Sequence, residues 1–394
     1  MAAARRIGVE ERRARLARRH HLSGGCGARS PVEASSSLVG LHGTDPSSVY
    51  LAAAARMPAA EPATVERALY EDRVLVRVLG MRRTMFVVPL DLAPIVQAAC
   101  TRAIAVRERR RTVQLLGRAG IADDPGAWFA ELEEATVRLL ATHGEGTAAE
   151  LSVHEPRLRT QLLLAQDKSY AASQSVSTRV LMQLAAEGRI IRGRPRGSWT
   201  SSQYRWAPIE AWLEEGIGEL PTDTARVELA RRWLGAFGPG TPADLKWWTG
   251  WTAGEVKRAV GKLGAAEVDL DGTAALVLRD DLEPVPAAEP WAALLPALDP
   301  TVMGWAGREW YLGGHGPSLF DRNGNGGPTV WWDGRIVGGW AQRKDGEVAY
   351  RLLEDVGTEG ARAVAAAAER LRTWIGAVRV TPRFRTPLER DLSA

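Results

Sequence analysis

The sequence has few of the residues that bind metals or carry redox chemistry. Its 394 residues include only two cysteines, Cys26 and Cys100, whose separation fits no metal-binding or redox motif. Its six histidines include no pair spaced four residues apart with a carboxylate partner, the helical arrangement that would place two ligands on one face. We therefore expect no bound metal and no cofactor.

Long apolar segments are also missing. No apolar run approaches the roughly 20 residues that cross a bilayer, and the N-terminus has no apolar segment of the kind found in secretory signals. Apolar residues make up 45% of the chain and charged residues 25%, which is ordinary for a soluble globular protein. We expect a cytoplasmic monomer with no membrane contact.

Several common catalytic motifs are absent as well. There is no Gly-Lys-Ser/Thr sequence, and a strand rather than a helix follows the glycine-rich segment 321–328, which we interpret as a turn. There is no Gly-x-Ser-x-Gly sequence that would present a serine nucleophile. Lysine is scarce, so a lyase that forms a Schiff base has no evident carrier near residues 38–51.

Positive charge is present, and it is unevenly distributed. The formal net charge is only +4, but three segments are rich in arginine and poor in acids: 1–30, 101–111 and 187–206. Each segment alone could be a solvated helix face. Together they favour a surface that binds a polyanion such as nucleic acid.

The segment 38–51 combines reactive polar residues with strong signals for the start of a helix. Asp45 is a suitable N-cap and Pro46 fits the first helical position, where its missing N–H costs nothing. His42 and Thr44 then lie on a short rigid connection that faces the helix N-terminus. Two interpretations stay open: these residues form a functional site, or they are solvated side chains beside a well-capped helix.

An order of helices followed by a strand or hairpin occurs three times, which is typical of tandem winged helix-turn-helix units. A basic helix at 9–22 comes first, and in the first unit we then expect two helices within 32–57, a third at 64–78 and a strand at 81–89. In the second we expect a helix at 128–143, a capping box at Thr147 and Glu150, a helix at 177–187 and a hairpin at 190–206. In the third we expect helices at 224–237, from 241 and at 252–263, then a hairpin at 268–278.

The sequence pattern changes after the third unit. Residues 283–290 are proline-rich, and after them short β runs alternate with glycine turns. We expect strands at 311–312, 329–332, 335–340 and 348–353, forming a small antiparallel β-barrel, and a helix at 359–375. The fold class is therefore α+β, with these boundaries: 1–30 basic arm, 31–125, 126–222 and 223–282 winged-helix units, 283–290 linker, 291–394 barrel-like domain.

Two groups of side chains are candidates for contact with nucleic acid. Arg192, Arg194 and Arg196 would stand at the tip of the second hairpin and could reach phosphates, although such contacts read no base sequence. Most of the 15 tryptophans should fill the core, but Trp247 and its neighbours Trp248 and Trp251 could instead stack on bases.

Several segments resemble the bacterial winged-helix DNA glycosylases of the AlkZ and YcaQ type. The residues that carry the resemblance lie at 38–46, 50–51, 55–56, 75–77, 81–84, 89, 319–322 and 337–340, and the first block is the most specific. The resemblance covers nearly the whole chain. It implies three tandem winged-helix units and a C-terminal β-barrel in a C-shape that holds duplex DNA.

The resemblance also implies the position of the catalytic residues. The family motif is Gln, any residue, then Gln or Asp, immediately before Asp-Pro, so this sequence has His42 and Thr44 at the two catalytic positions. Neutral His42 could act as a general base for water, with its pKa lowered by the helix N-terminus. Thr44 could fix the water, and Asp45 could cap the helix and tune the charge. The expected DNA contacts are Arg82, Arg83, Arg192, Arg194, Arg196, Lys246 and Trp247.

The implied function is DNA repair: a monofunctional glycosylase that hydrolyses the N-glycosidic bond of alkylated purines in duplex DNA. The substrates would carry N7 or N3 substituents, including bulky adducts and crosslinks. The alternative is a winged-helix DNA-binding protein without catalysis, either a regulator or a factor that shields lesions. A third class, an array that binds only proteins, would have scattered arginines rather than arginines lining one face.

Overall fold

The structure is a computed structural model that describes residues 5–57, 59–164 and 172–394. The predicted α+β class is confirmed, because these residues form many helices and several small, mostly antiparallel sheets. Parts of the predicted arm (1–4) and of the second predicted unit (165–171) lie outside the described residues. No helix in the described part of the chain is long and apolar enough to cross a membrane.

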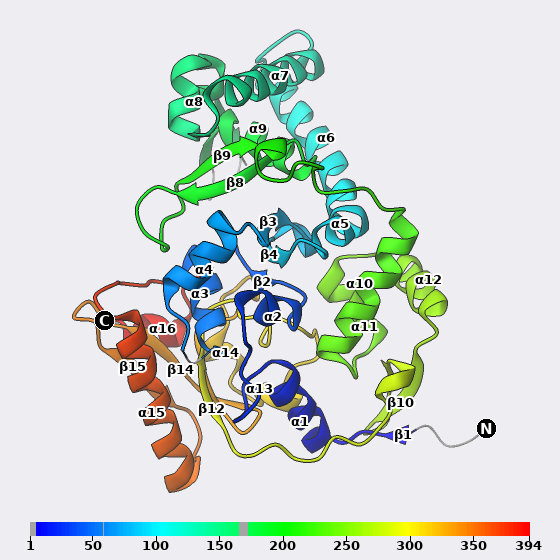
Figure 1. Cartoon of the computed structure of the whole chain (residues 1–394), viewed down its shortest axis with the longest axis vertical. Coiled ribbons are helices and arrows are strands. Elements are labelled where there is room, and N and C mark those ends of the chain that lie inside the picture. The colour runs from blue at the N-terminus through cyan, green and yellow to red at the C-terminus, as the bar shows by residue number, and fades with distance from the viewer. Residues whose placement is uncertain (1–4, 58, 165–171) are drawn as a thin grey trace.

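Figure 1 shows how the elements are arranged. Helices α6 to α9 and the hairpin β8–β9 (within residues 102–208) form an upper lobe, and the sheet β2–β4 (within 41–89) lies at the centre with α2 to α5 (within 31–96) around it. Helices α10 to α12 lie to one side of this centre. The C-terminal strands and α15 lie on the other side, so the chain curves around the central sheet.

The N-terminal region ends in a small sheet whose strand order is β2-β4-β3. In the element labels, η marks a short π-helical or 3₁₀ turn. The elements of this region are β1 Arg5–Arg6, α1 Val9–Arg19, α2 Pro31–Ser36, β2 Leu41–His42, α3 Pro46–Ala54, α4 Pro62–Glu66, η1 Arg67–Glu71, β3 Leu75–Leu79, η2 Met81–Arg83 and β4 Met85–Pro89.

Two sequence predictions in this region were wrong. The helix expected over 64–78 ends at Glu71, because Arg73 adopts a positive φ of 53° that breaks the helix. Residues Leu75–Leu79 then form strand β3, paired antiparallel with β4. The strand expected over 81–89 begins only at Met85, since Arg82 and Arg83 form a tight turn with φ values of 52° and 61°.

The middle region contains two long helices and a hairpin. Its elements are α5 Ala93–Val96, η3 Gln97–Thr101, α6 Arg102–Arg118, α7 Pro125–His143, β5 Gly146–Thr147, α8 Ala148–His154, η4 Pro156–Arg159, β6 Gln161–Leu164, β7 Ala172–Ser175, α9 Val176–Ala186, β8 Ile190–Pro195, β9 Tyr204–Pro208 and η5 Ile209–Ala211. The predicted capping box at Thr147 and Glu150 is confirmed. Strand β5 pairs with β9, which gives the sheet order β5-β9-β8.

The next region repeats the order of helices and hairpin. It consists of α10 Thr222–Phe237, α11 Pro242–Thr249, α12 Ala253–Leu263, β10 Ala266–Leu270, β11 Thr273–Val277 and η6 Arg279–Asp281. Capping boxes begin both short helices, at Thr241 with Asp244 and at Thr252 with Glu255. The hairpin turns at Asp271–Gly272, where both residues have positive φ.

The C-terminal region is built on an antiparallel sheet of order β12-β13-β14-β15. Its elements are β12 Ala292–Leu295, α13 Glu309–Leu312, α14 Gly316–Leu319, β13 Thr329–Trp332, β14 Arg335–Gln342, β15 Val348–Leu352, α15 Gly357–Ile375 and α16 Pro387–Leu392. Among the described residues this sheet is open, with β12 and β15 at its edges, so it is not the closed barrel that we expected. Helix α15 packs on this sheet and contacts β12, β13 and β15. The predicted strand at 311–312 belongs to α13.

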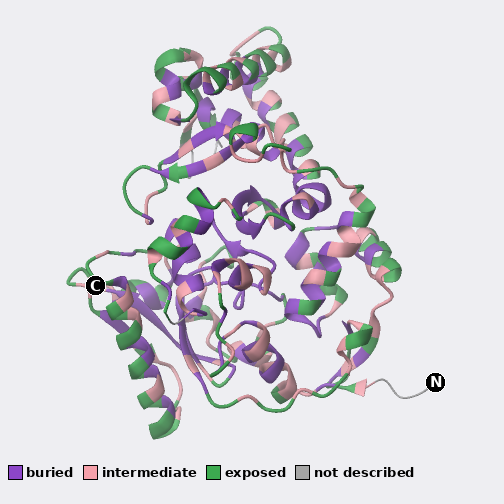
Figure 2. Cartoon of the chain, in the orientation of Figure 1, coloured by how far each residue is buried: buried purple, intermediate pink, exposed green. Residues whose placement is uncertain are grey.

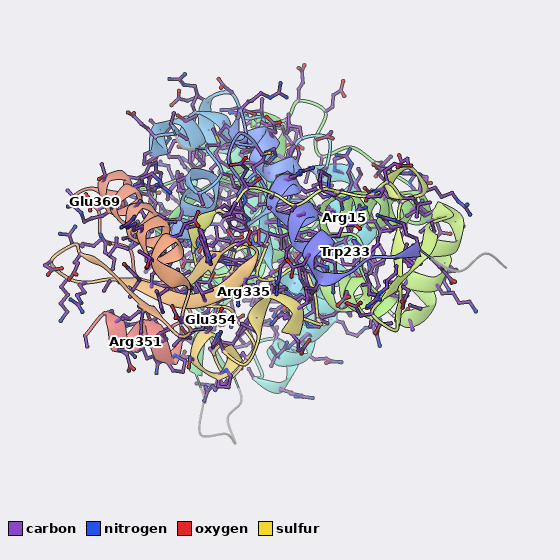
Figure 3. The ribbon with its side chains drawn as sticks, turned by 90° about the horizontal axis from the view of Figure 1, so that it is seen from below. Arg15, Trp233, Arg335, Arg351, Glu354 and Glu369 are labelled. Carbon is purple, nitrogen blue, oxygen red and sulfur yellow. The ribbon has the colours of Figure 1, made fainter. Side chains whose placement is uncertain are left out.

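Buried residues occur in each of these regions (Figure 2), and the largest apolar cluster of the described residues joins residues from all of them. Nine of the fifteen tryptophans are buried, which confirms that most of them fill the core. One aromatic cluster joins Phe237 of α10 to Trp305, with ring centroids 5.2 Å apart, and to Trp248 of α11 at 6.0 Å. Arg335 and Glu354 of the C-terminal region form a half-exposed ion pair at 2.6 Å (Figure 3), whereas Arg56 and Asp299 pair within the interior.

Candidate active site

The central sheet holds the segment that contains His42 and Thr44. Strand β2 pairs antiparallel with β4, so that His42 lies opposite Phe86. The Gly43 N–H donates to the Met85 carbonyl at 2.7 Å and extends this pairing. The sequence pattern predicts that His42 lies on a connection between two helices. It belongs to a strand instead, because β4 supplies backbone hydrogen bonds that the sequence does not reveal.

His42 is buried and electrically neutral. Its side chain is 4% exposed, its ring centroid lies 5.2 Å from that of Phe86, and its Nδ1 has no hydrogen-bond partner among the described residues. Burial lowers the pKa of His42 to about 3, with a further contribution from the positive charge of Arg82. The pKa of His42 is lowered, as predicted. Burial is the main cause, whereas the sequence analysis attributes the shift to the helix N-terminus.

Thr44 and Asp45 connect β2 to α3. The Thr44 hydroxyl is half-buried and accepts a hydrogen bond from the Met85 N–H at 3.3 Å. Asp45 is the N-cap of α3, as predicted: its Oδ1 accepts from the Ser47 N–H at 3.1 Å and from the Ser47 hydroxyl at 2.9 Å. Its Oδ2 accepts from the Arg383 N–H at 3.1 Å. Both oxygens are therefore engaged, which limits the role of Asp45 in tuning charge.

A stack of cationic and aromatic groups lies near His42. The guanidinium of Arg82 is 3.8 Å from the ring centroid of Trp247, and that of Arg308 is 4.6 Å from the same residue and 4.8 Å from Phe320. Burial, followed by the charge of Arg308, lowers the pKa of Arg82 to about 10. The fold thus brings together two predicted residues that are 165 positions apart and adds Arg308, which the sequence analysis missed because it lies outside any basic segment.

The neighbours of this stack have different surroundings. Arg83 is exposed and pairs with Glu108 at 2.7 Å, and Lys246 is exposed on α11. Trp248 and Trp251 are buried, so of the three tryptophans considered for base stacking only Trp247 is partly exposed. Arg82 already lies over the Trp247 ring, and a base could stack there only on the remaining surface.

The predicted hairpin arginines do not form one group at its tip. Arg192 lies within β8, with its guanidinium 5.2 Å from the Tyr204 ring and 5.0 Å from the Trp206 ring. Arg194 pairs with Glu71 at 2.9 Å, and Arg196 pairs with Glu150 at 3.5 Å.

The connection between β8 and β9 is held against helices from both ends of the chain. It reaches down toward α3 and α4 (Figure 1). Its buried Trp199 packs against Tyr50 at 5.2 Å and Trp374 at 5.7 Å. The tip of the predicted hairpin is therefore packed onto α3 and α15 through aromatic contacts.

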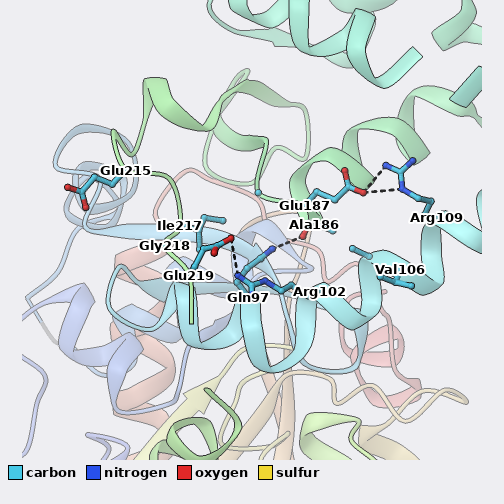
Figure 4. A pocket seen from close by; sticks show the side chains of 12 residues that line it. Gln97, Arg102, Val106, Arg109, Ala186, Glu187, Glu215, Ile217, Gly218 and Glu219 are labelled. Carbon is cyan, nitrogen blue, oxygen red and sulfur yellow. Dashed lines mark hydrogen bonds and ion pairs between the residues drawn. The ribbon is translucent and has the colours of Figure 1, made fainter. Parts of the chain in front are cut away.

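One sizeable cavity lies away from these residues (Figure 4). It has a volume of about 500 Å³ and lies between α6, the end of α9 and the segment 215–219. Gln97 donates to the Ala186 carbonyl at 2.8 Å in its wall, and Arg109 pairs with Glu187 at 2.7 Å. None of its lining residues belongs to the predicted site.

Comparisons with known proteins identify the class. A family model described as "DNA glycosylase AlkZ-like" matches residues 36–374. The chain therefore belongs to the AlkZ-like DNA glycosylase family.

A solved structure supports the fold. The Streptomyces sahachiroi DNA glycosylase AlkZ superposes with a TM-score of 0.72 at 21% sequence identity, covering 93% of this chain and 97% of that chain. A likeness at this identity concerns the fold. Curated proteins include no match to this sequence.

Proposed function

We propose that this protein is a monofunctional DNA glycosylase that hydrolyses the N-glycosidic bond of alkylated purines in duplex DNA. The observation that carries the proposal, beside family membership, is the neutral buried His42 next to the Thr44 hydroxyl and the Arg82–Trp247 stack. Three tandem winged-helix units would hold the duplex. The substrates would be N7- or N3-substituted purines, including bulky or crosslinked ones.

The proposed reaction needs little acid catalysis from the protein. A purine alkylated at a ring nitrogen carries positive charge and is already a good leaving group. The remaining task is to position water for attack at the sugar, through hydrogen bonds to the His42 imidazole and the Thr44 hydroxyl. A base with a pKa of about 3 is weak, so orientation contributes more than proton abstraction in the free protein.

DNA binding would strengthen the base. A phosphate bound at Arg82 would offset the positive charge that helps to lower the pKa of His42. We assign the phosphate contacts to Arg82, Arg83, Lys246, to Arg192 and Arg194 of β8 and to Arg196 just after it, with Trp247 beside them. The proposed reaction is hydrolytic, because His42 and Thr44 offer an imidazole and a hydroxyl that can hold and orient water.

The first test is base release by the wild-type protein from duplex DNA that carries N7-alkylguanine. We expect release of the modified base and an abasic product with an intact strand, whereas undamaged duplex should stay unchanged. Small and bulky adducts should be compared. Salt-sensitive DNA binding without release from any adduct would reject the glycosylase and favour the DNA-binding protein without catalysis.

The pH dependence of release tests the state of His42. Because kcat/KM reports groups of the free enzyme, a pKa of about 3 predicts a nearly constant kcat/KM between about pH 5 and pH 8. An ordinary histidine, with a pKa near 6.5, would instead become protonated and inactive, lowering the rate about tenfold per pH unit below 6.5. The spontaneous rate without protein is subtracted at each pH. An acidic fall centred near 6.5 would contradict a buried neutral His42.

A further inference from the structure

Arg77 lies on the opposite face of the central sheet from His42. Along β3 and β4, Arg77 is in register with Val87 and hence with Leu41, whereas Val78 is in register with Phe86 and His42. Because successive side chains of a strand point to opposite faces, Arg77 shares its face with Gly43, which follows His42. Its Nη1 would lie 3.4 Å from a Cβ on Gly43, so the guanidinium reaches the backbone of the proposed catalytic segment.

Arg77 is buried with most of its hydrogen-bonding capacity unused. Arg77 is only 6% exposed, and its Nε and Nη1 have no hydrogen-bond partner among the described residues. Its Nη2 makes a long contact of 3.4 Å to the Tyr70 hydroxyl. The guanidinium lies 5.0 Å from the Tyr204 ring. The hydroxyls of Tyr50 and Tyr204 are also buried without a partner in the described chain.

Two further arginines approach the same place from distant segments. Arg192 of β8 lies 5.2 Å from the Tyr204 ring, and its Nε is buried without a partner in the part of the chain that is described. Burial lowers the pKa of Arg192 to about 10, and the nearby charges of Arg77 and Arg383 contribute to the shift. The backbone N–H of Arg383 donates to Asp45, which holds its main chain beside this segment, and its side chain is exposed.

The charges of these three arginines are not compensated. Within the described residues, Arg77, Arg192 and Arg383 form no ion pair, whereas Arg194, two residues further along β8, pairs with Glu71 and Glu66. The adjacent carboxylate, Asp45, is already engaged as a helix cap. Arg77 is buried and Arg192 is half-buried, and buried charge without a partner is costly to the folded state, so their arrangement is typical of a site whose counter-charge arrives with a ligand.

We propose that Arg77, Arg192 and Arg383 form a phosphate site that holds the backbone of the DNA strand beside Gly43–Asp45. A guanidinium presents its N–H donors in a planar fork that matches phosphate oxygens, and the two tyrosine hydroxyls can add donors. The three arginines act as positioning residues. This inference rests on the proposed function, because it takes the bound anion to be a DNA phosphodiester. It adds Arg77 and Arg383 to the DNA contacts proposed above.

The test is the salt dependence of binding to an undamaged duplex, measured by fluorescence anisotropy. Each lost phosphate contact should reduce the slope of log K against log salt concentration by about 0.9. We expect such a reduction for Arg77→Gln, Arg192→Gln and Arg383→Gln. The matched control is Arg189→Gln, just before β8, because Arg189 is already paired with Glu134 at 2.7 Å and should leave the slope unchanged.

Each outcome decides the proposal. Arg383 is exposed, so Arg383→Gln keeps the test valid if Arg77→Gln does not fold. Unchanged slopes for Arg192→Gln and Arg383→Gln would overturn the site. Inorganic phosphate that raises the melting temperature of the wild type but not of these variants, with unchanged DNA slopes, would overturn the DNA assignment in favour of a free anion. Reduced slopes in a protein that releases no base would retain this site and reject the glycosylase.

Discussion

His42→Ala is expected to slow the release of N7-alkylguanine from duplex DNA by about 10²–10⁴-fold, the range expected when a residue that orients the attacking water and can accept its proton is removed. The loss should appear in a single-turnover rate, because the variant lacks the acceptor that would hold the attacking water beside Thr44. DNA affinity should stay close to that of the wild type, since a neutral buried imidazole makes no phosphate contact.

Two variants sharpen this experiment. His42→Gln retains a hydrogen-bond acceptor and restores the residue that the family motif has at this position, so it should keep more activity than His42→Ala. His143→Ala is the matched control, because His143 is exposed at the end of α7 and stacks on His154. Thermal melting of each variant separates loss of chemistry from loss of fold. Release that is unchanged in His42→Ala would place the chemistry elsewhere.

Asp299→Ala is expected to lower the free energy of unfolding by about 3–5 kcal/mol, the usual cost of removing one partner of a buried ion pair. Asp299 and Arg56 are both fully buried, and their two hydrogen bonds measure 2.8 and 2.9 Å. Arg56 also donates to the Thr301 hydroxyl at 2.8 Å, which is itself 2.9 Å from His20 Nδ1. Without the carboxylate, the guanidinium stays buried with its charge unpaired.

Denaturant unfolding followed by tryptophan fluorescence measures this loss. The matched control is Glu369→Ala, at a residue of α15 that Figure 3 shows. It breaks an exposed pair with Arg372 and should leave the unfolding midpoint nearly unchanged. Combining Asp299→Leu with Arg56→Met removes both charges and should recover part of the stability. A loss in Asp299→Ala no larger than that of the control would contradict a structural role for this network.

The sequence by itself determined the elements whose signals are local. The cap at Asp45 with Pro46, the capping box at Thr147 and the turn at Asp271–Gly272 each depend on residues within one helical turn or hairpin. Such contacts form wherever the residues stand in that order, so helix starts and hairpins could be predicted. The resemblance in segment 38–46 likewise pointed to the family that the comparison over 36–374 established.

Only the tertiary structure decided the chemistry of the site. Pairing of β2 with β4 turns His42 into a strand residue facing Phe86, and burial there sets its pKa. The meeting of Arg82 with Trp247, and of Arg77 with Tyr204, joins side chains that are more than 100 positions apart. No local pattern encodes these contacts, because desolvation and charge at a point depend on every segment packed around it.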